Sequence, residues 1–575
     1  MDFNLNLKKL RNKLSELCID SILVSMNSSF ENTDESFSDI RFISGFSGSN
    51  GRAIVSLKEA ILSVDGRYTK QAIEQTDAAI WKIELYPVVD TIKMIEDVLE
   101  KGNTLGVGAL SVTYKTYLSI LKLSQKLGFK ILPMARHPVQ EEKKITKSNV
   151  SLTLMNEEHM GESIKSRIER VKETLQDNEA ALLADKVMIG WIFGIRRSEL
   201  SKDKSVLANC IAFIPKLGMP AVFCDLELKA NQTDFEMKHF NEFESYINNI
   251  EKVTVNLNYN NTPAYFALIL EKSGFKIKPS EKEFGSFEII KNKTEITNQK
   301  SGAELTSLAF IKTLSFLENT KQTSETEIAK FFENKIMENK HAIGLSFTTI
   351  SAFKDNTSIV HYNPFISGGK EILGDGLFLL DAGAHFNNST TDMTRVVYRG
   401  DSPPEEYKII YSNVLKSLIM FSTAHFPDNS YAACIDSIAR IPIWNLGYDY
   451  AFGTGHGVGC AGNVHEPPRI SQLSQDKLNS SIILTVEPGI YKENFGMRLE
   501  NMLLTKPSSK NPNFIHFETL NFIPFCRKLI RRDIFENSEI DWLNDYHFQT
   551  LKKFKDKLGS DEIAINWLEE NTKEI

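Results

Sequence analysis

The second half of the chain contains a series of short apolar segments, and each has an ionisable side chain at or near one end. Asp381 ends LFLLD, Asp392 opens TDMTRVV, Glu487 ends SIILTVE and Glu500 lies in MRLENMLL. His456 adds an imidazole within the glycine-rich segment GTGHGVG. Short apolar runs bounded by polar turns predict buried strands. Any fold of this sequence must therefore provide opposite charges or bound cations for several carboxylates beside buried strands, because an unpaired buried carboxylate is costly in free energy.

The polar turn HFNNST separates Asp381 from Asp392, so the two flanking strands read as a hairpin. A hairpin can place one carboxylate from each strand side by side, where like charges destabilise the sheet unless a cation lies between them. Four carboxylates and one imidazole are too rich in oxygen for a structural zinc site. They suit Mn(II), and Co(II), Fe(II) or Zn(II) could also bind. Their combined negative charge fits two divalent ions that share bridging carboxylates.

Two further histidines flank this set. His361 lies in SIVHYNP and His465 in GNVHEPP, each at the end of an apolar segment. A single histidine of this kind is more often structural, but the position of both beside the acids favours a place in the same cavity. Arg498 shares a strand face with Glu500, because side chains alternate with a period of two along a strand.

The first half of the chain contains two copies of one helix–strand plan. A helical pattern runs into the strand SILVS up to Ser25, and the same pattern leads into EAALLA up to Ala184. The offset of about 160 residues is too long for a solenoid repeat and predicts two tandem α/β domains. The charged segment 141–149 reads as a linker. The first helix carries one apolar stripe, formed by Leu7, Leu10, Leu14 and Leu17.

The last part begins with a helical pattern over 305–318 and a second helix that Thr323 or Ser324 could cap. Strand-like segments follow, which predicts an α+β domain. The sequence thus predicts three domains, at 1–145, 146–295 and 296–575.

Composition excludes several classes of protein. The 575 residues carry a net charge of -7, which argues against a broad nucleic-acid-binding surface. We find no apolar run long enough to span a bilayer and no signal-peptide h-region behind the first lysines. The six cysteines form no CxxC pair, which favours a reducing compartment. We therefore expect a cytoplasmic protein without a nucleic-acid or membrane partner.

The ordered motifs of the second half resemble those of the pita-bread metallopeptidases, and in particular the three-domain Xaa-Pro aminopeptidases (aminopeptidase P). The matching stretches are GLSFTTI, IVHYNP, LDAGAHFNNSTTDMTR, GTGHGVG, NVHEPP, TVEPGIYKENFGMRLENMLL and DWLNDYH. In the first half, RFISGFSGSNG with DGRYTKQA resembles one creatinase-type N-terminal domain, and GWIFGIRRSEL resembles a second. The resemblance implies two creatinase-type α/β domains followed by a pita-bread α+β catalytic domain.

The resemblance also implies an activity, the hydrolysis of the N-terminal Xaa-Pro peptide bond by a hydroxide that bridges two Mn(II) ions. The implied metal ligands are Asp381, Asp392, His456, Glu487 and Glu500. His361 and His465 match the family's histidines that contact substrate. Glu487 is expected to pass a proton from water to the leaving nitrogen, because a carboxylate beside metals can do so. The expected catalytic residues are thus His361, His465 and Glu487, and the expected contacts to substrate are His361, His465, Arg498 and Phe452. The implied partners are peptides with proline in the second position and a second copy of the chain, bound through the C-terminal domain.

The chain departs from the family pattern at several places. Phe452 stands where a histidine commonly precedes GTGHGVG, and Arg197 to Glu199 belong to RRSE where RGSD is usual. Ala303 and Thr306 replace a His and an Asp of the opening helix. Two alternatives stay open: a prolidase that cleaves only Xaa-Pro dipeptides, and a non-catalytic peptide-binding relative.

Overall fold

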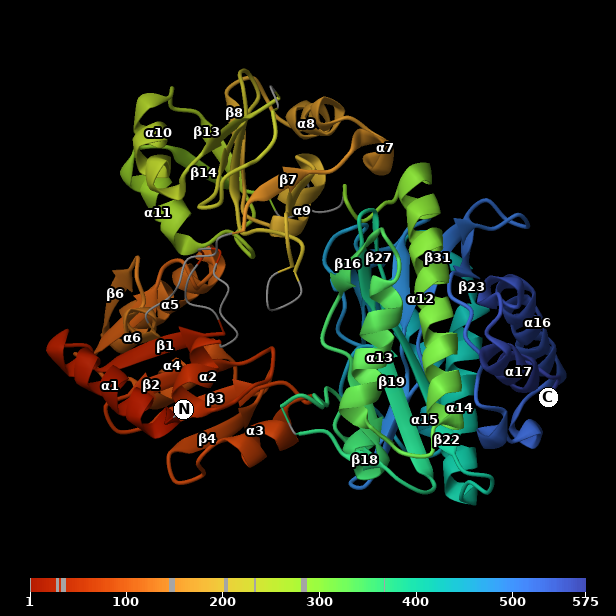
Figure 1. Ribbon diagram of the computed structural model, residues 1–575. Helices are drawn as coiled ribbons and strands as arrows, with labels where there is room; N and C mark the ends of the chain where they lie inside the picture. Colours follow the sequence, from red (N-terminus) through yellow and green to blue (C-terminus); the bar gives the residue numbers. More distant parts are fainter. Residues whose placement is uncertain are drawn as a thin grey trace. The chain divides into compact units, whose positions relative to one another are not determined.

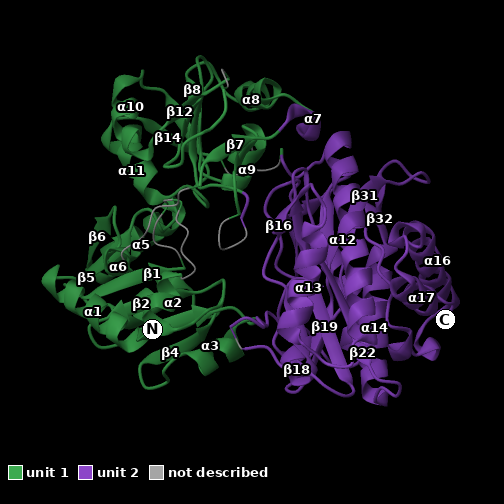
Figure 2. Ribbon diagram, viewed as in Figure 1, with its two compact units in different colours: residues 1–155, 162–203, 207–287 green, residues 156–161, 204–206, 288–575 purple. Residues whose placement is uncertain are grey.

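The structure, a computed structural model, describes residues 2–26, 30, 32, 38–143, 150–200, 205–231, 234–280, 287–366 and 368–575. The chain forms two compact units (Figure 2). Unit 1 comprises residues 1–155, 162–203 and 207–287, and unit 2 comprises residues 156–161, 204–206 and 288–575. Among the described helices, none is both long and apolar enough to cross a membrane. The predicted boundary between 145 and 146 lies outside the described residues, so the division into three domains stays a prediction.

Unit 1 contains two six-stranded sheets with matching strand orders, β4-β3-β2-β1-β5-β6 and β12-β11-β10-β8-β13-β14 (Figure 1). The directions of the strands also correspond. Read along the strand order, the five pairings of each sheet are parallel, antiparallel, antiparallel, parallel and parallel. The strands of the first sheet are β1 (Ser21–Ser25), β2 (Arg52–Ser56), β3 (Ala60–Val64), β4 (Trp81–Leu85), β5 (Thr104–Gly108) and β6 (Lys130–Met134). Those of the second are β8 (Glu179–Leu183), β10 (Ile211–Pro215), β11 (Ala221–Phe223), β12 (Glu236–Lys238), β13 (Thr254–Leu257) and β14 (Lys276–Pro279). The repeated plan read from the sequence thus corresponds to one repeated sheet.

Helices pack on both sheets of unit 1. Around the first sheet they are α1 (Phe3–Glu16), α2 (Asp39–Ser44), α3 (Thr69–Gln75), α4 (Thr91–Val98), α5 (Tyr114–Leu127) and α6 (Pro138–Lys143). With the second sheet come α8 (Ile164–Glu173), α9 (Lys186–Ile192), α10 (Phe243–Asn249), α11 (Ala264–Lys272) and the strand pair β7 (Leu152–Leu154) and β9 (Ile195–Arg197). In α1, Leu7, Leu10 and Leu14 are buried as predicted, but Leu17 is 42% exposed because the helix ends at Glu16.

Unit 2 contains a six-stranded sheet of order β23-β32-β31-β28-β25-β26 and a three-stranded sheet of order β17-β19-β22. An isolated bridge between Thr394 and Glu500 links the two sheets. The strands of these sheets are β17 (Ile350–Phe353), β19 (Gly376–Ala382), β22 (Met393–Arg399), β23 (His425–Pro427), β25 (Gly455–Gly457), β26 (Glu466–Ile470), β28 (Ile483–Val486), β31 (Asn501–Pro507) and β32 (Phe514–Thr519).

Smaller pairings complete the strands of unit 2. They involve β15 (Thr323–Ser324) with β18 (Glu371–Ile372), β16 (Ala342–Leu345) with β20 (Ala384–Phe386) and β21 (Ser389–Thr390), β24 (Ser430–Tyr431) with β27 (Lys477–Leu478), and β29 (Gly489–Tyr491) with β30 (Gly496–Arg498). The helices of unit 2 are α7 (Glu157–Met160), α12 (Lys293–Asn319), α13 (Glu325–Met337), α14 (Glu405–Ser422), α15 (Ala432–Asn445), α16 (Asn537–Phe554) and α17 (Glu562–Asn571).

Strand β19 is covered on both faces, as its unbroken apolar sequence requires. Phe378 and Leu380 belong to one core, which also contains side chains of α12, α13 and α17. Leu377 and Leu379 belong to another core, to which α14 and α15 contribute. By the alternation of side chains along a strand, Asp381 lies on the same face as Leu377 and Leu379.

The helix α12 begins earlier than the sequence pattern indicated, at Lys293 instead of near 305. Asn292 accepts a hydrogen bond from the backbone N–H of Glu295 and the Glu295 side chain accepts one from that of Asn292, which forms a capping box. The Asn292 amide also donates to the Met160 carbonyl in α7 (2.8 Å). Ser324, one of the two caps that the sequence allowed, caps α13 with Glu327 in the same way.

The buried His547 in α16 gives a pH-dependent prediction. It is fully buried, and its Nε2 accepts a hydrogen bond from the Phe525 N–H (3.2 Å). Burial lowers the pKa of His547 to about 4, whereas an unfolded histidine titrates near 6.5. Below pH 6.5 the unfolded chain therefore binds a proton that the folded chain does not. The free energy of unfolding should be constant above pH 6.5 and fall by about 3 kcal/mol as the pH drops towards 4.

Urea unfolding of the full chain at pH 7 and pH 5, followed by a signal from unit 2, measures this loss of free energy. His547→Gln should remove most of the difference between the two pH values, whereas His341→Gln, at an exposed position, should leave it unchanged. An equal pH dependence in wild type and His547→Gln would contradict the assignment.

Candidate metal centre

The two aspartates come together across β19 and β22. These strands pair antiparallel, and Asp381 lies opposite Thr394, two residues after Asp392. The connection is more than a hairpin turn, because β20 and β21 lie within it, pair with each other, and β20 also pairs with β16. A side chain at Gly383 would place its Cβ 1.9 Å from the Thr391 carbonyl oxygen, so glycine allows the close approach of these segments.

The two glutamates reach the same place from the larger sheet. The Thr394 hydroxyl donates to Glu500 Oε2 (2.8 Å), and the Glu500 N–H donates to the Thr394 carbonyl (3.1 Å). Glu487 follows β28 directly, and its N–H donates to the Thr454 carbonyl (2.7 Å). Each carboxylate is thus held by the backbone at a strand end, which limits its freedom to turn away.

His456 presents its Nε2 to the carboxylates. Nε2 lies 3.5 Å from Asp392 Oδ2 and 3.6 Å from Glu487 Oε1, while Nδ1 lies 3.0 Å from the Gly457 carbonyl oxygen. A hydrogen bond from Nδ1 to that carbonyl leaves Nε2 as the electron-pair donor, which is the arrangement of a metal-binding histidine. The flanking Gly455 is required, since its Cβ would lie 2.0 Å from the Thr485 carbonyl oxygen.

The five predicted ligands, together with His465, form three overlapping groups, in each of which the ligand atoms lie within 4.8 Å of one another. The groups are Asp392, His456 and His465; His456, Glu487 and Glu500; and Asp381, Asp392 and Glu500. Every predicted ligand therefore has at least two others within 4.8 Å, close enough to share ions that take ligands at about 2.0–2.2 Å. Their assignment as ligands stays a prediction.

The electrostatics of this cluster favour bound cations. Burial and then the charges of Asp381 and Glu487 raise the pKa of Asp392, and burial and then Asp392 raise that of Glu500. Burial lowers the pKa of His456. Among the described residues, Asp381 Oδ1 is buried without a hydrogen-bond partner. Divalent ions would compensate the crowded carboxylates and satisfy that oxygen, so the donor set fits the implied metals.

Arg498 and Tyr491 form the wall behind Asp381. The buried Arg498 guanidinium donates to Asp381 Oδ2 and to the Tyr491 hydroxyl, and its Nε lies 3.9 Å from Glu487 Oε2. Burial alone would lower the pKa of Arg498, but Tyr491 and Asp381 raise it. Tyr491 was not predicted from the sequence. The signal that could have found it is its strand β29, which pairs with the strand that ends at Arg498.

Phe452 lies beside this wall. Its ring is 4.9 Å from that of Tyr450 and makes an edge contact with that of Tyr491 (5.7 Å). Its backbone carbonyl accepts a hydrogen bond from Arg440 (2.8 Å). Phe452 is therefore packed into the wall of the site, and its role toward substrate stays a prediction.

The two predicted catalytic histidines differ in their placement. The exposed His465 contributes a nitrogen to one of the three ligand groups, and its ring lies 4.3 Å from that of His456. His361 is half-buried, and the carbonyl of its neighbour Val360 lies 3.5 Å from Arg498 Nη1. The structure thus places the His465 side chain beside Asp392, whereas near His361 it is the Val360 carbonyl that lies next to Arg498.

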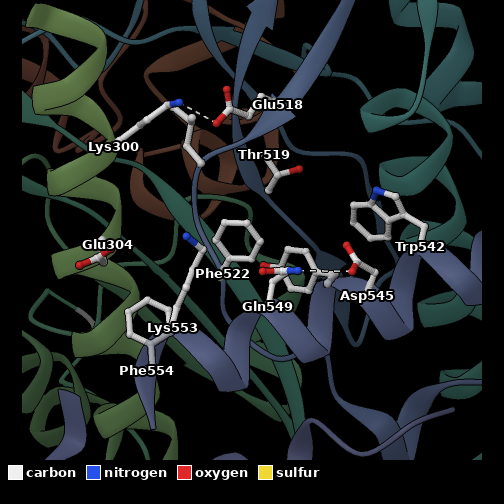
Figure 3. Close-up of a pocket in the computed structure, with 12 residues that line it drawn as sticks. Lys300, Glu304, Glu518, Thr519, Phe522, Trp542, Asp545, Gln549, Lys553 and Phe554 are labelled. Atoms are coloured by element: carbon white, nitrogen blue, oxygen red, sulfur yellow. Dashed lines mark hydrogen bonds and ion pairs between the residues drawn. The ribbon is translucent and has the colours of Figure 1, made fainter. Parts of the chain in front are cut away.

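A separate hollow of about 370 Å³ lies between α12, the end of β32 and α16 (Figure 3). Lys300 crosses its mouth to Glu518 (2.6 Å), and Phe522 and Trp542 form part of its lining. It contains none of the predicted site residues and no convergent set of ligand atoms among the described side chains. Among the described residues, the groups of possible metal ligands therefore lie in the acid cluster and not in this hollow.

Comparisons with known proteins show which family the chain resembles. Residues 298–507 match Metallopeptidase family M24, residues 513–575 match the C-terminal region of peptidase_M24, and residues 6–132 match the Creatinase/Prolidase N-terminal domain. The Xaa-Pro aminopeptidase app-1 of Caenorhabditis elegans is 30% identical over 93% of this chain and 92% of its own length. A probable Xaa-Pro aminopeptidase P of Paracoccidioides brasiliensis is 28% identical over all of both chains.

Solved structures show the same fold. The crystal structure of the X-prolyl aminopeptidase from Caenorhabditis elegans, described as a cytosolic enzyme with a di-nuclear active site, superposes with a TM-score of 0.92 at 28% identity over all of both chains. The prolidase from Pyrococcus horikoshii covers 63% of this chain and 99% of its own, with a TM-score of 0.52 at 23% identity.

Proposed function

The chain belongs to the Xaa-Pro aminopeptidases of metallopeptidase family M24, and on that premise we propose that it removes the residue preceding a proline at a peptide N-terminus. It is a metal-dependent hydrolase with creatinase-type and pita-bread architecture. The observation that carries the proposal is the convergence of four carboxylates and one imidazole within one buried cluster. A non-catalytic relative would have no reason to keep so costly a group of charges.

The proposed residue roles follow from the geometry. When bound, two divalent ions lower the pKa of a water molecule and polarise the scissile carbonyl. Glu487, less buried than the other acids, would take a proton from that water and pass it to the leaving nitrogen. His465 and His361 would donate hydrogen bonds to the developing oxyanion. Asp381, with one oxygen unpaired, would attract the substrate's α-amino group and so select a free N-terminus.

We further propose Mn(II) as the native ion and the division into domains at 1–145, 146–295 and 296–575. A cytoplasmic location is supported by the free state of all six cysteines and by the relative described as cytosolic.

A homodimer through the C-terminal domain is our proposal for the assembly. Support comes from exposed apolar side chains on and after α15, where Ile441 and Trp444 are each 42% exposed and Tyr448 is 37% exposed. Such a patch on one helix is typical of an interaction surface. Sedimentation as a monomer of 65.1 kDa would contradict the dimer.

Hydrolysis assays test the function directly. Metal-stripped protein reloaded with Mn(II), Co(II) or Zn(II) should cleave Xaa-Pro-Xaa tripeptides and release the first residue, and should act poorly on Xaa-Pro dipeptides. A preference for dipeptides would identify a prolidase instead. Metal uptake without turnover of either substrate would identify the non-catalytic alternative.

A further inference from the structure

A buried ion pair lies directly next to His465. Lys291 Nζ donates to Glu466 Oε1, and both side chains are only 2% exposed. The ammonium group also donates to the Glu288 carbonyl. The free energy of removing two charges from water offsets much of their mutual attraction, so such a pair is weak evidence for a role in stability. Its position in the chain suggests another role, because Glu466 is the residue that follows His465.

Lys291 starts from a fixed backbone. Its N–H donates to the Ser481 carbonyl (2.8 Å), two residues before β28, the strand that leads to Glu487. The next residue, Asn292, caps α12. The backbone from which the Lys291 side chain extends to Glu466 is therefore itself hydrogen-bonded next to the strand that leads to Glu487.

The loop from Gly459 to Glu466 is anchored on both sides of His465. On one side, the Gly462 N–H and carbonyl both lie 3.2 Å from the Thr390 hydroxyl oxygen. On the other side, Glu466 pairs with Gly457 at an irregular register of β25 and β26. The Glu466 carboxylate lies under the loop, since a Cβ on Gly459 would be 2.8 Å from its Oε2. Between these anchors, His465 is exposed, and its ring lies 4.3 Å from that of the buried His456.

We propose that Lys291 and Glu466 are positioning residues for His465, and that their ion pair fixes where the imidazole stands relative to His456 and Asp392. The inference rests on the proposed function, in which His465 donates a hydrogen bond to the reacting amide. Neither partner touches the substrate. Their effect on the rate comes from alignment, for which a displacement of about 1 Å can cost about 100-fold.

A double-mutant cycle separates this role from a purely structural one. Lys291→Met, which keeps the length of the side chain, should lower kcat about 10- to 100-fold with KM and metal content unchanged. In the His465→Ala protein, the same substitution should cause no further loss, because the group that it displaces is gone. The matched control is Lys300→Met, which makes the same change within the following helix α12 and removes the half-exposed pair with Glu518. It should leave kcat unchanged in both backgrounds.

A second measurement does not need turnover. Diethyl pyrocarbonate acylates exposed imidazoles, and mass spectrometry of the labelled peptides gives the rate at His465. Lys291→Met should change that rate at least severalfold, while Lys300→Met should not. If Lys291→Met fails to fold, Glu466→Gln serves instead, because it keeps the shape of the side chain and a hydrogen bond from Lys291 while removing the charge.

The outcomes distinguish this inference from the proposed function. Losses of kcat that multiply in the cycle, or unchanged labelling of His465, overturn the positioning role even in an active enzyme. An inactive wild type that still shows altered labelling in Lys291→Met overturns the proposed function and leaves the positioning of His465 supported.

Discussion

Replacing Asp392 by asparagine is expected to lower kcat/KM for Xaa-Pro-Xaa peptides by about a thousand-fold and to reduce the bound metal. Asp392 belongs to two of the three ligand groups and lies 3.5 Å from His456. An amide cannot supply the negative charge that would hold the ions. Metal assistance would contribute several kcal/mol to such a hydrolysis, which corresponds to about three powers of ten in rate. Metal analysis beside the peptide assay measures both effects.

The same substitution should stabilise the metal-free protein. Burial and neighbouring acids raise the pKa of Asp392 in the folded chain above its unfolded value near 3.9. The folded state then binds the extra proton, so stability is fully present below about pH 4 and is lost as the pH rises through the raised pKa. Thermal unfolding in chelator at pH 5 and pH 8 should therefore show a smaller loss for Asp392→Asn than for wild type.

The control is Asp375→Asn, which makes the same change at an exposed position one residue before β19. It should alter neither activity nor metal content. Full metal content and near-normal turnover in Asp392→Asn would mean that the cluster does not hold the catalytic ions.

Phe452→His is expected to raise the turnover of Xaa-Pro-Xaa peptides by up to about 100-fold without changing metal content. A phenylalanine cannot donate a hydrogen bond, and one missing donor near a developing charge costs about 100- to 1000-fold in rate. The Phe452 ring lies against Tyr491, whose hydroxyl is bound by Arg498. An imidazole in the same space would therefore stand close to the acid cluster without being one of its ligands.

Phe452→Ala separates a missing donor from a packing role. If the ring supports Tyr491 and Tyr450 or packs against substrate, its removal should lower activity further. If only the donor is missing, alanine should change the rate little. Unchanged or reduced turnover in Phe452→His would show that the site has compensated for the loss of the histidine.

The strands and their terminal charges could be predicted because both depend on local sequence. An apolar run that ends in Asp381 or Glu487 indicates a buried strand and a charge that needs compensation, and the structure brings these groups together. The repeat in the first half was readable for the same reason, since helix and strand periodicity recur in order.

Other features depend on contacts between distant segments, and local patterns do not encode them. The segment between Asp381 and Asp392 pairs with β16, so the expected simple hairpin is more elaborate. Lys291 and Glu466 are 175 positions apart, and no periodicity connects them. The sequence around Tyr491 indicates only a strand, and its contact with Arg498 shows that it belongs to the site.

The short helix α7 has a consequence for how the protein is made. It belongs to unit 2, although the chain that surrounds it in sequence belongs to unit 1. Its His159 and Met160 carbonyls accept hydrogen bonds from Asn298 and Asn292 at the start of α12. A ribosome therefore releases this piece of unit 2 after residues 1–155 of unit 1 but before residues 162–287. Its hydrogen bonds to α12 can form only once that intervening part of unit 1 has been made. A truncated gene that starts at residue 288 would give an α12 whose first turn lacks these two acceptors.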